Sequence, residues 1–81
     1  MKQQAIFYKI RDIISPYLDE PCDIKMETHL IQDLAINSFD YTNIITDIED
    51  TFRIRIDDLT MYYIKDLVRF IIQHDQKEGV E

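Results

Sequence analysis

The chain has 81 residues, and its 16 acidic side chains against 9 lysines and arginines give a formal charge of −7. A chain this short forms a single small domain over residues 1–81, with no room for a deep cleft between two lobes. Its acidity excludes nucleic acid as a partner, because phosphate binding needs clustered lysines and arginines. Hydrophobic residues make up 46% of the chain, which is too many for a disordered acidic tail. We therefore expect a folded, acidic domain.

The sequence also argues against membrane spans, disulfides and metal centres. The longest apolar runs have four residues, as in 5–8 and 61–64, which is too short for a signal peptide or a membrane span. The single cysteine, Cys22, cannot form an intramolecular disulfide, and no cysteine and histidine cluster has zinc-ligand spacing. We expect a cytoplasmic protein without a metal, in which Cys22 is an ordinary loop thiol.

Helical spacing of apolar residues begins near the N-terminus. One apolar stripe predicts a first helix over about residues 3–15. Its members are Ile6, Ile10, Ile13, Ile14 and Tyr17. The helix should end before Pro16, because the residue that precedes a proline disfavours helical dihedral angles.

A long loop and a second helix follow. Over residues 16–37 the apolar residues keep no period, so we expect a loop held on the core by scattered hydrophobic side chains. Asn37 and Ser38 are both residue types that cap helix N-termini, and they predict a second helix over about 38–52. Its apolar stripe consists of Tyr41, Ile44, Ile45, Ile48 and Phe52.

The last third of the chain predicts a connection and a final helix. Residues 52–56 alternate apolar and basic side chains as a strand does, but the chain offers no second strand to pair with. We therefore expect an extended connection, a short helix or turn over 57–62, a last helix over about 63–73 and a frayed tail over 74–81. The expected fold is all-α: a small bundle of three principal helices, with a short or reduced third helix and a long loop between helices one and two.

The negative charge is concentrated in the middle of the chain. Residues 12–52 contain ten acids and one base, Lys25, which gives this part a net charge of −9. Such a charged face either aids solubility or orients the encounter with basic partners. The ten acids are Asp12, Asp19, Glu20, Asp23, Glu27, Asp33, Asp40, Asp47, Glu49 and Asp50.

A motif at the start of the second helix resembles that of a known family. The segment 33–40, DLAINSFD, is similar to the attachment motif of acyl carrier proteins, commonly DLGxDSLD, in which the serine carries 4'-phosphopantetheine. Asp33, Leu34, Ser38 and Asp40 match in place. The resemblance extends over the helix order and the acidic second helix.

Four departures from the family pattern accompany this resemblance. Asn37 stands where the family has an aspartate before the serine, Ala35 stands where it has a glycine, and residues 57–63 are shorter than the family's short third helix. Asn43 also replaces a usual acid on the second helix. These differences leave open which enzyme modifies the serine, and they suggest partners other than those of the housekeeping fatty-acid carrier.

The resemblance implies a carrier, not an enzyme, modified on Ser38. A phosphopantetheinyl transferase would move the arm from coenzyme A to this serine, and the thiol of the arm would hold acyl intermediates in fatty-acid, polyketide or related biosynthesis. Independently of the family, a serine at a helix N-terminus is exposed and lies beside N–H groups that favour a phosphodiester. An ordinary helix cap is the alternative for this residue.

The resemblance also implies surfaces for partners and cargo. We expect a monomer whose partners, the transferase and acyl-handling enzymes, dock through basic patches. The docking residues are expected to be Phe39, Asp40, Asp47, Glu49 and Asp50, with Asp40, Asp47 and Asp50 facing solvent. Candidates for lining the acyl chain, with ordinary core packing as the alternative, are Ile44, Ile48, Ile64 and Leu67.

Two other functions remain open at this point. One is a carrier of amino acids or aryl acids, which shares the modified serine but not the cargo. The other is an unmodified acidic interaction module, which Asn37 makes conceivable. His29 and His74 have no partner at catalytic or metal-binding spacing, so we predict that both are surface histidines.

Overall fold

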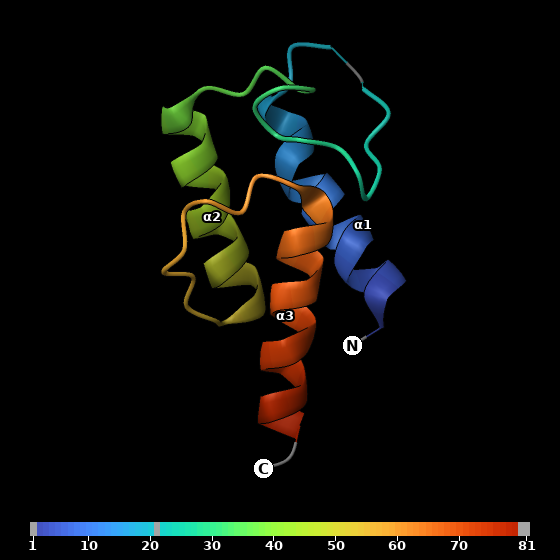
Figure 1. The fold of residues 1–81 in the computed structure, drawn as a ribbon, viewed down its shortest axis with the longest axis vertical. Coiled ribbons are helices and arrows are strands. Elements are labelled where there is room, and N and C mark those ends of the chain that lie inside the picture. The colour runs from blue at the N-terminus through green and yellow to red at the C-terminus, as the bar shows by residue number, and fades with distance from the viewer. Residues whose placement is uncertain (1, 21, 80–81) are drawn as a thin grey trace.

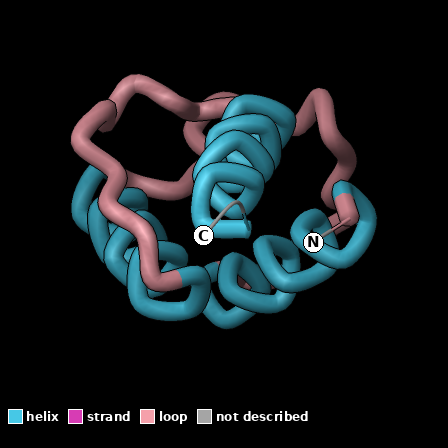
Figure 2. The backbone as a smooth tube through the Cα atoms, turned by 90° about the horizontal axis from the view of Figure 1, so that it is seen from below, coloured by secondary structure: helices cyan, strands magenta, loops and turns pink. Residues whose placement is uncertain are grey.

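The computed structural model describes the backbone of residues 2–20 and 22–79 and the side chains of residues 2–20 and 22–74. Its elements, in chain order, are α1 (Gln3–Ile14), a 3-10 helix η1 (Ser15–Tyr17), α2 (Ser38–Phe52) and α3 (Ile64–Gly79). Helix α1 packs against both α3 and α2, and the loops run around the three helices (Figures 1 and 2). The predicted all-α bundle is confirmed.

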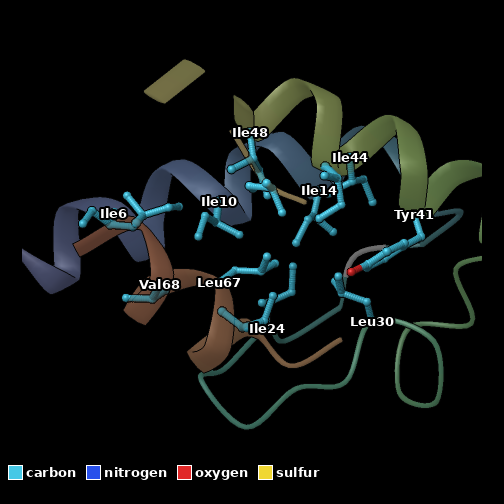
Figure 3. Close-up of a cluster of buried hydrophobic side chains, with 14 of the residues drawn as sticks. Ile6, Ile10, Ile14, Ile24, Leu30, Tyr41, Ile44, Ile48, Leu67 and Val68 are labelled. Carbon is cyan, nitrogen blue, oxygen red and sulfur yellow. The ribbon is translucent and has the colours of Figure 1, made fainter. Parts of the chain in front are cut away.

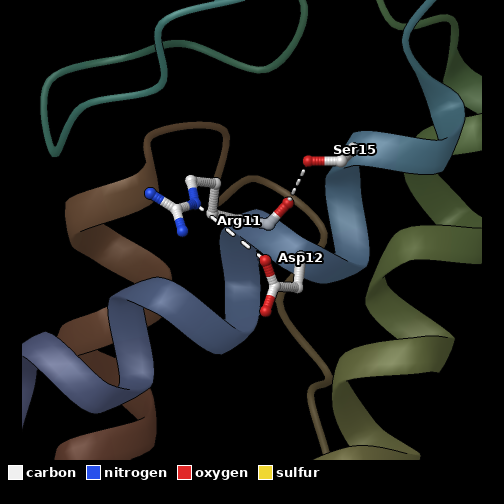
Figure 4. Close-up of polar contacts among 3 residues, drawn as sticks. All are labelled: Arg11, Asp12 and Ser15. Carbon is white, nitrogen blue, oxygen red and sulfur yellow. Dashed lines mark hydrogen bonds and ion pairs between the residues drawn. The ribbon is translucent and has the colours of Figure 1, made fainter. Parts of the chain in front are cut away.

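Helix α1 is continued by a turn that includes a proline. The sequence places the end of the helix near residue 15 and the loop from residue 16, whereas η1 carries helical backbone on through Pro16 to Tyr17. A proline is tolerated there because the first turn of a helix needs no N–H from it. The Ser15 hydroxyl donates to the Arg11 carbonyl at 2.8 Å, which satisfies a carbonyl in the last turn of α1 (Figure 4). The 16–37 loop is therefore shorter than predicted.

Each of the three α-helices contributes one apolar stripe to a single core. Buried side chains from the loops complete it: Ile24, Leu30 and Ile36 come from the long loop, and Ile56 comes from the connection after α2. Burial of these stripes is the main favourable contribution to folding. The helical members of the core, most of them labelled in Figure 3, are Ile6, Ile10, Ile14, Tyr41, Ile44, Ile45, Ile48, Ile64, Leu67, Val68 and Ile71.

The long loop is joined to the start of α3 by backbone hydrogen bonds. The Leu30 amide donates to the Tyr62 carbonyl at 2.8 Å, and a bridge pairs His29 with Tyr63 in antiparallel sense. The Ile64 amide donates to the Thr28 carbonyl at 3.1 Å. Since the first amides of a helix lack partners within it, the loop carbonyls also cap α3.

The loop ends in a turn whose last residue is left-handed. The Ala35 amide donates to the Ile31 carbonyl at 3.0 Å, and Ala35 itself has φ 55°. This is an αL cap, which glycine adopts without the steric cost that Cβ imposes. Ala35 therefore stores backbone strain at the position where acyl carrier proteins commonly have glycine.

Residues 54–63 form an extended connection with one turn. Ile56 is buried and Ile54 is partly buried, while residues 59–60 form the turn. The Asp58 carboxylate accepts from both the amide and the hydroxyl of Thr60, and these bonds hold the pKa of Asp58 below its usual value. The stretch 57–62, predicted as a short helix or a turn, is a turn without a helix.

The C-terminal helix is longer than the sequence indicated. We predicted a helix over 63–73 and a frayed tail over 74–81, but α3 continues through Gly79, and residues 80–81 lie outside the described residues. The prediction was wrong for 74–79 because it stopped where the apolar stripe stopped. A helix needs only its own backbone bonds to continue, and residues 73–78 contain neither glycine nor proline.

The strain at Ala35 gives a stability prediction. Ala35→Gly should raise the free energy of unfolding by about 1 kcal/mol, because Gly adopts the left-handed backbone without a Cβ clash. That gain corresponds to an increase of about 4–8 °C in Tm for a domain of this size. The matched control is Ala5→Gly, which places glycine inside α1 and should lower stability by about 0.5–1 kcal/mol. Thermal unfolding that shows both variants destabilised would contradict the strain at Ala35.

Candidate functional site

Ser38 is the first residue of α2, and its side chain is exposed. Asn37 caps the helix: its Oδ1 accepts from the Asp40 amide at 2.8 Å, and its carbonyl accepts from the Tyr41 amide at 2.9 Å. Within the part of the chain that the structure describes, the amides of Ser38 and Phe39 have no hydrogen-bond acceptor. The serine hydroxyl therefore lies beside free donors at the positive end of the helix dipole.

An open pocket of about 460 Å³ lies beside Ser38. Three parts of the chain build it: the turn at the end of the long loop, the first turn of α2 and the connection before α3. This convergence depends on the pairing of the loop with the start of α3. The lining residues are His29, Ile31, Gln32, Ser38, Tyr41, Thr42, Leu59 and Tyr62.

His29 holds the turn that forms one side of the pocket. Its Nδ1 accepts from the amides of Ile31, at 3.1 Å, and Gln32, at 2.9 Å, so the proton of the neutral ring is on Nε2. The ring stacks on Tyr62, with centroids 5.4 Å apart. The sequence predicted a surface histidine, but His29 is half-buried and lines the pocket. No local signal could reveal this, because the contact joins residues far apart in the chain.

The motif residue Asp33 also has a structural role here. Its carboxylate accepts from the His29 amide at 2.7 Å, and its own amide donates to the His29 carbonyl at 2.9 Å. These two bonds close the turn that leads to Asn37 and Ser38. Asp33 therefore helps to position the serine without lining the pocket.

Tyr41 is buried between the pocket and the core. Only 4% of its surface is exposed, and its hydroxyl donates to the Met61 carbonyl at 2.9 Å. Its ring centroid is 5.0 Å from that of Tyr62. Burial, with smaller contributions from Tyr62 and Asp58, raises the pKa of Tyr41 to about 12.

The predicted docking residues of α2 separate into exposed and engaged side chains. Phe39 is 74% exposed and Asp50 is exposed, whereas Asp40 is half-buried at the helix start. Asp47, predicted to face solvent, is half-buried and accepts from the Tyr17 hydroxyl at 2.8 Å. This bond, with burial and the charges of Asp47 and Asp40, raises the pKa of Tyr17.

Glu49 is also engaged within the protein. Its Oε2 accepts from the Ile56 amide at 2.7 Å, and its carbonyl accepts from the Ile54 amide at 3.2 Å. The carboxylate thus holds the extended connection on the end of α2. Ile56 is buried beside this anchor, a contact that the sequence pattern did not indicate.

The four candidates for lining the acyl chain are all core residues. Each is completely buried, and none of them lines the pocket beside Ser38. Their contact with cargo stays a prediction. They are Ile44, Ile48, Ile64 and Leu67.

The described residues also bear on membrane and metal-binding functions. Residues 2–20 and 22–79 contain no helix with the length and hydropathy that a membrane crossing requires. The same residues contain no group of three or more histidine, cysteine, aspartate or glutamate side chains placed to hold a metal ion.

The chain is similar to several proteins named acyl carrier protein. It is 36% identical over 73 residues to that of Phytoplasma mali, covering 85% of this chain and 87% of the relative. It is 30% identical over 80 residues to that of Cyanophora paradoxa, covering 88% of this chain and 78% of the relative. It is 36% identical over 69 residues to that of Lactococcus lactis, covering 83% of this chain and 93% of the relative. No family model matches the chain.

Fold, site and relatives together define the protein's class. A small helical bundle with an exposed serine at a helix N-terminus, similar over most of its length to acyl carriers, is a carrier and not a catalyst. The chain belongs to the acyl carrier protein family.

The raised pKa of Tyr41 predicts a loss of stability at alkaline pH. Tyrosine in the unfolded chain ionises near pH 10, whereas folded Tyr41 ionises at about 12. The fold favours the neutral phenol. Its stabilising contribution to the free energy of unfolding is therefore complete below about pH 10 and falls as the pH rises from about 10 to about 12. Urea unfolding between pH 10 and pH 12 should show that the free energy of unfolding falls less steeply with pH in Tyr41→Phe than in wild type. Tyr8→Phe, at an exposed position, is the control and should leave the slope unchanged.

Proposed function

We propose that Ser38 carries 4'-phosphopantetheine and that the protein transports acyl intermediates as thioesters on this arm. The observation that supports the proposal is the exposed Ser38 hydroxyl at the capped start of α2, within a motif that matches the family's attachment motif. The names of the relatives favour acyl groups over amino acids as cargo. We place the protein, as a monomer, in the cytoplasm and in fatty-acid, polyketide or related biosynthesis.

The residues around Ser38 fit a phosphodiester. The amides of Ser38 and Phe39 are donors for an anionic oxygen, and the dipole of α2 favours negative charge at this end. The neutral Asn37 preserves the helix cap without adding a carboxylate beside the phosphate. When bound, the arm supplies the thiol that forms the thioester, while Asn37 and Asp33 hold the helix start that orients the serine.

The partners proposed for this protein are a phosphopantetheinyl transferase and the enzymes that load or act on the cargo. Phe39 and Asp50 are exposed and Asp40 is partly exposed, and we propose that these three dock on basic patches, with the aromatic ring next to the serine. Asp47 and Glu49 contribute charge to the same helix but already accept hydrogen bonds from Tyr17 and Ile56. We therefore expect these two acids to affect partner binding through the negative electrostatic potential of α2 and through the stability of the fold, more than through direct contact.

The proposed modification can be tested with the protein, coenzyme A, Mg²⁺ and a broad-specificity phosphopantetheinyl transferase. Intact mass should increase by one arm in wild type and remain unchanged in Ser38→Ala. The matched control is Ser15→Ala, because Ser15 is the only other serine and is also exposed. Addition to Ser38→Ala, or no addition to wild type and Ser15→Ala, would refute the proposal.

The docking face gives a second test with the same transferase. Asp40→Asn and Asp50→Asn should each raise KM about two- to fivefold, the size expected for an exposed charge pair worth up to ~1 kcal/mol. The effect should shrink at high salt, since exposed charges are screened over about 8–10 Å at physiological ionic strength. Asp12→Asn on α1 removes a similarly exposed charge and should leave KM unchanged. Equal effects of all three variants would point to net charge instead of a docking face.

A further inference from the structure

The pocket beside Ser38 has an uncharged lining in the most acidic part of the chain. No aspartate, glutamate, lysine or arginine lines it, and the lining histidine, His29, has no proton on Nδ1 because this atom accepts two amide hydrogens. Most of the lining comes from residues 12–52, where ten acids stand against one base. A pocket of this composition suits a neutral ligand better than an ion, because it holds no partner of opposite charge.

The same lining combines apolar surface with free polar groups. Ile31 and the half-exposed Leu59 supply apolar contact. The Nε2–H of His29, the hydroxyl of Tyr62 and the side-chain amide of Gln32 make no hydrogen bond to other residues within the described part of the chain. The pocket volume of about 460 Å³ is that of a small-molecule site. We therefore look for a small neutral ligand with both methyl and hydrogen-bonding groups.

The aromatic wall of the pocket is fixed before any ligand arrives. The His29 ring stacks on Tyr62, with centroids 5.4 Å apart, and meets Tyr63 edge to face at 4.9 Å. The His29 amide is held by the Asp33 carboxylate at 2.7 Å. A wall that is already ordered binds a ligand at a lower entropic cost than one that must first be ordered.

Ser38 itself lines this pocket, so a group attached to its hydroxyl starts at the pocket. Thr42, one helical turn later, also lines it, and its hydroxyl donates to the Ser38 carbonyl at 3.0 Å. A group on a short flexible tether has an effective concentration on the order of millimolar at a site within its reach. Weak contacts in the pocket are therefore enough to hold a tethered group there for much of the time.

We propose that this pocket is a resting site for the arm itself, and that it binds the neutral pantoyl part of 4'-phosphopantetheine. This inference rests on the proposed modification of Ser38. The pantoyl part directly follows the phosphate and carries two geminal methyl groups, a hydroxyl and an amide. The methyl groups contact Ile31 and Leu59, and the hydroxyl and the amide carbonyl bind His29 and Tyr62. The phosphate stays at the start of α2, beside the free amides.

A docked arm has a consequence for delivery. The half of the arm that ends in the thiol extends beyond the pantoyl contacts, so the thiol stays available for loading. A partner enzyme that needs the full length of the arm has to draw the pantoyl part out of the pocket. The pocket therefore sets how much of the arm is free in the absence of a partner.

The test is an NMR measurement on the loaded protein, with the two geminal methyl groups of the arm isotopically labelled. In wild type, nuclear Overhauser effects should connect these methyl groups with side-chain protons of Ile31 and Leu59. Their chemical shifts should also differ from those of free 4'-phosphopantetheine. Both signals report on the position of the arm and not on the activity of the carrier.

Single substitutions measure how the pocket contributes. Leu59→Ala should lower the ratio of docked to free arm about fourfold, the size expected for the loss of one buried methylene contact. Tyr62→Phe keeps the ring and removes the hydroxyl, and it should lower the ratio about two- to tenfold. The matched control is Tyr63→Phe, which removes the hydroxyl of the next, exposed tyrosine outside the pocket and should leave the ratio unchanged.

The outcomes separate this inference from the function on which it rests. If wild type accepts no arm, both fail. If wild type is loaded but its arm methyl groups show no contact with Ile31 or Leu59 and keep the chemical shifts of the free compound, the resting site is refuted while the carrier function stands. Equal losses in Leu59→Ala, Tyr62→Phe and Tyr63→Phe would also overturn it. The wild-type measurement decides the question even where a variant does not fold.

Discussion

The antiparallel pairing of the long loop with the start of α3 is the contact on which the site depends. Three backbone bonds join the two segments, from Leu30 to Tyr62, from Ile64 to Thr28 and from Lys65 to Met26. They satisfy the first amides of α3 and hold a loop that has little regular structure of its own. Because the same loop leads directly into α2, the pairing sets where the helix that bears Ser38 begins relative to α3.

The pocket beside Ser38 follows from this pairing. It brings His29 against Tyr62, and Tyr62 against Tyr41, so that side chains from three segments enclose one hollow. Two residues within the segment 33–40 stabilise this arrangement: Asp33 closes the turn by accepting a hydrogen bond from the His29 amide, and Asn37 caps α2. The motif therefore has a structural role in this chain, because two of its residues hold the turn and the helix start.

The acidity of α2 serves two different purposes in the structure. Asp47 and Glu49 stabilise the fold: Asp47 accepts a hydrogen bond from Tyr17, and Glu49 accepts one from the Ile56 amide in the connection after α2. Asp50 remains exposed, and Asp40 is half-buried beside the capped start of the helix. The acids of α2 therefore hold two neighbouring segments through hydrogen bonds, while the helix still presents negative charge to solvent.

Local pattern was enough to determine the apolar stripes, the bounds 38–52 of α2 and the family motif around Ser38, because periodicity and capping depend on residues within one or two turns. It could not place His29 at the pocket, assign Glu49 to the Ile56 amide or bring the Tyr41 hydroxyl to Met61. It also ended the last helix too early, since residues 74–79 continue α3 without an apolar stripe. Only the tertiary structure showed which acids of α2 accept hydrogen bonds within the protein, and that Tyr41 lies between the pocket and the core. These contacts join segments that are far apart in the sequence. They depend on packing and leave no periodic pattern in the chain.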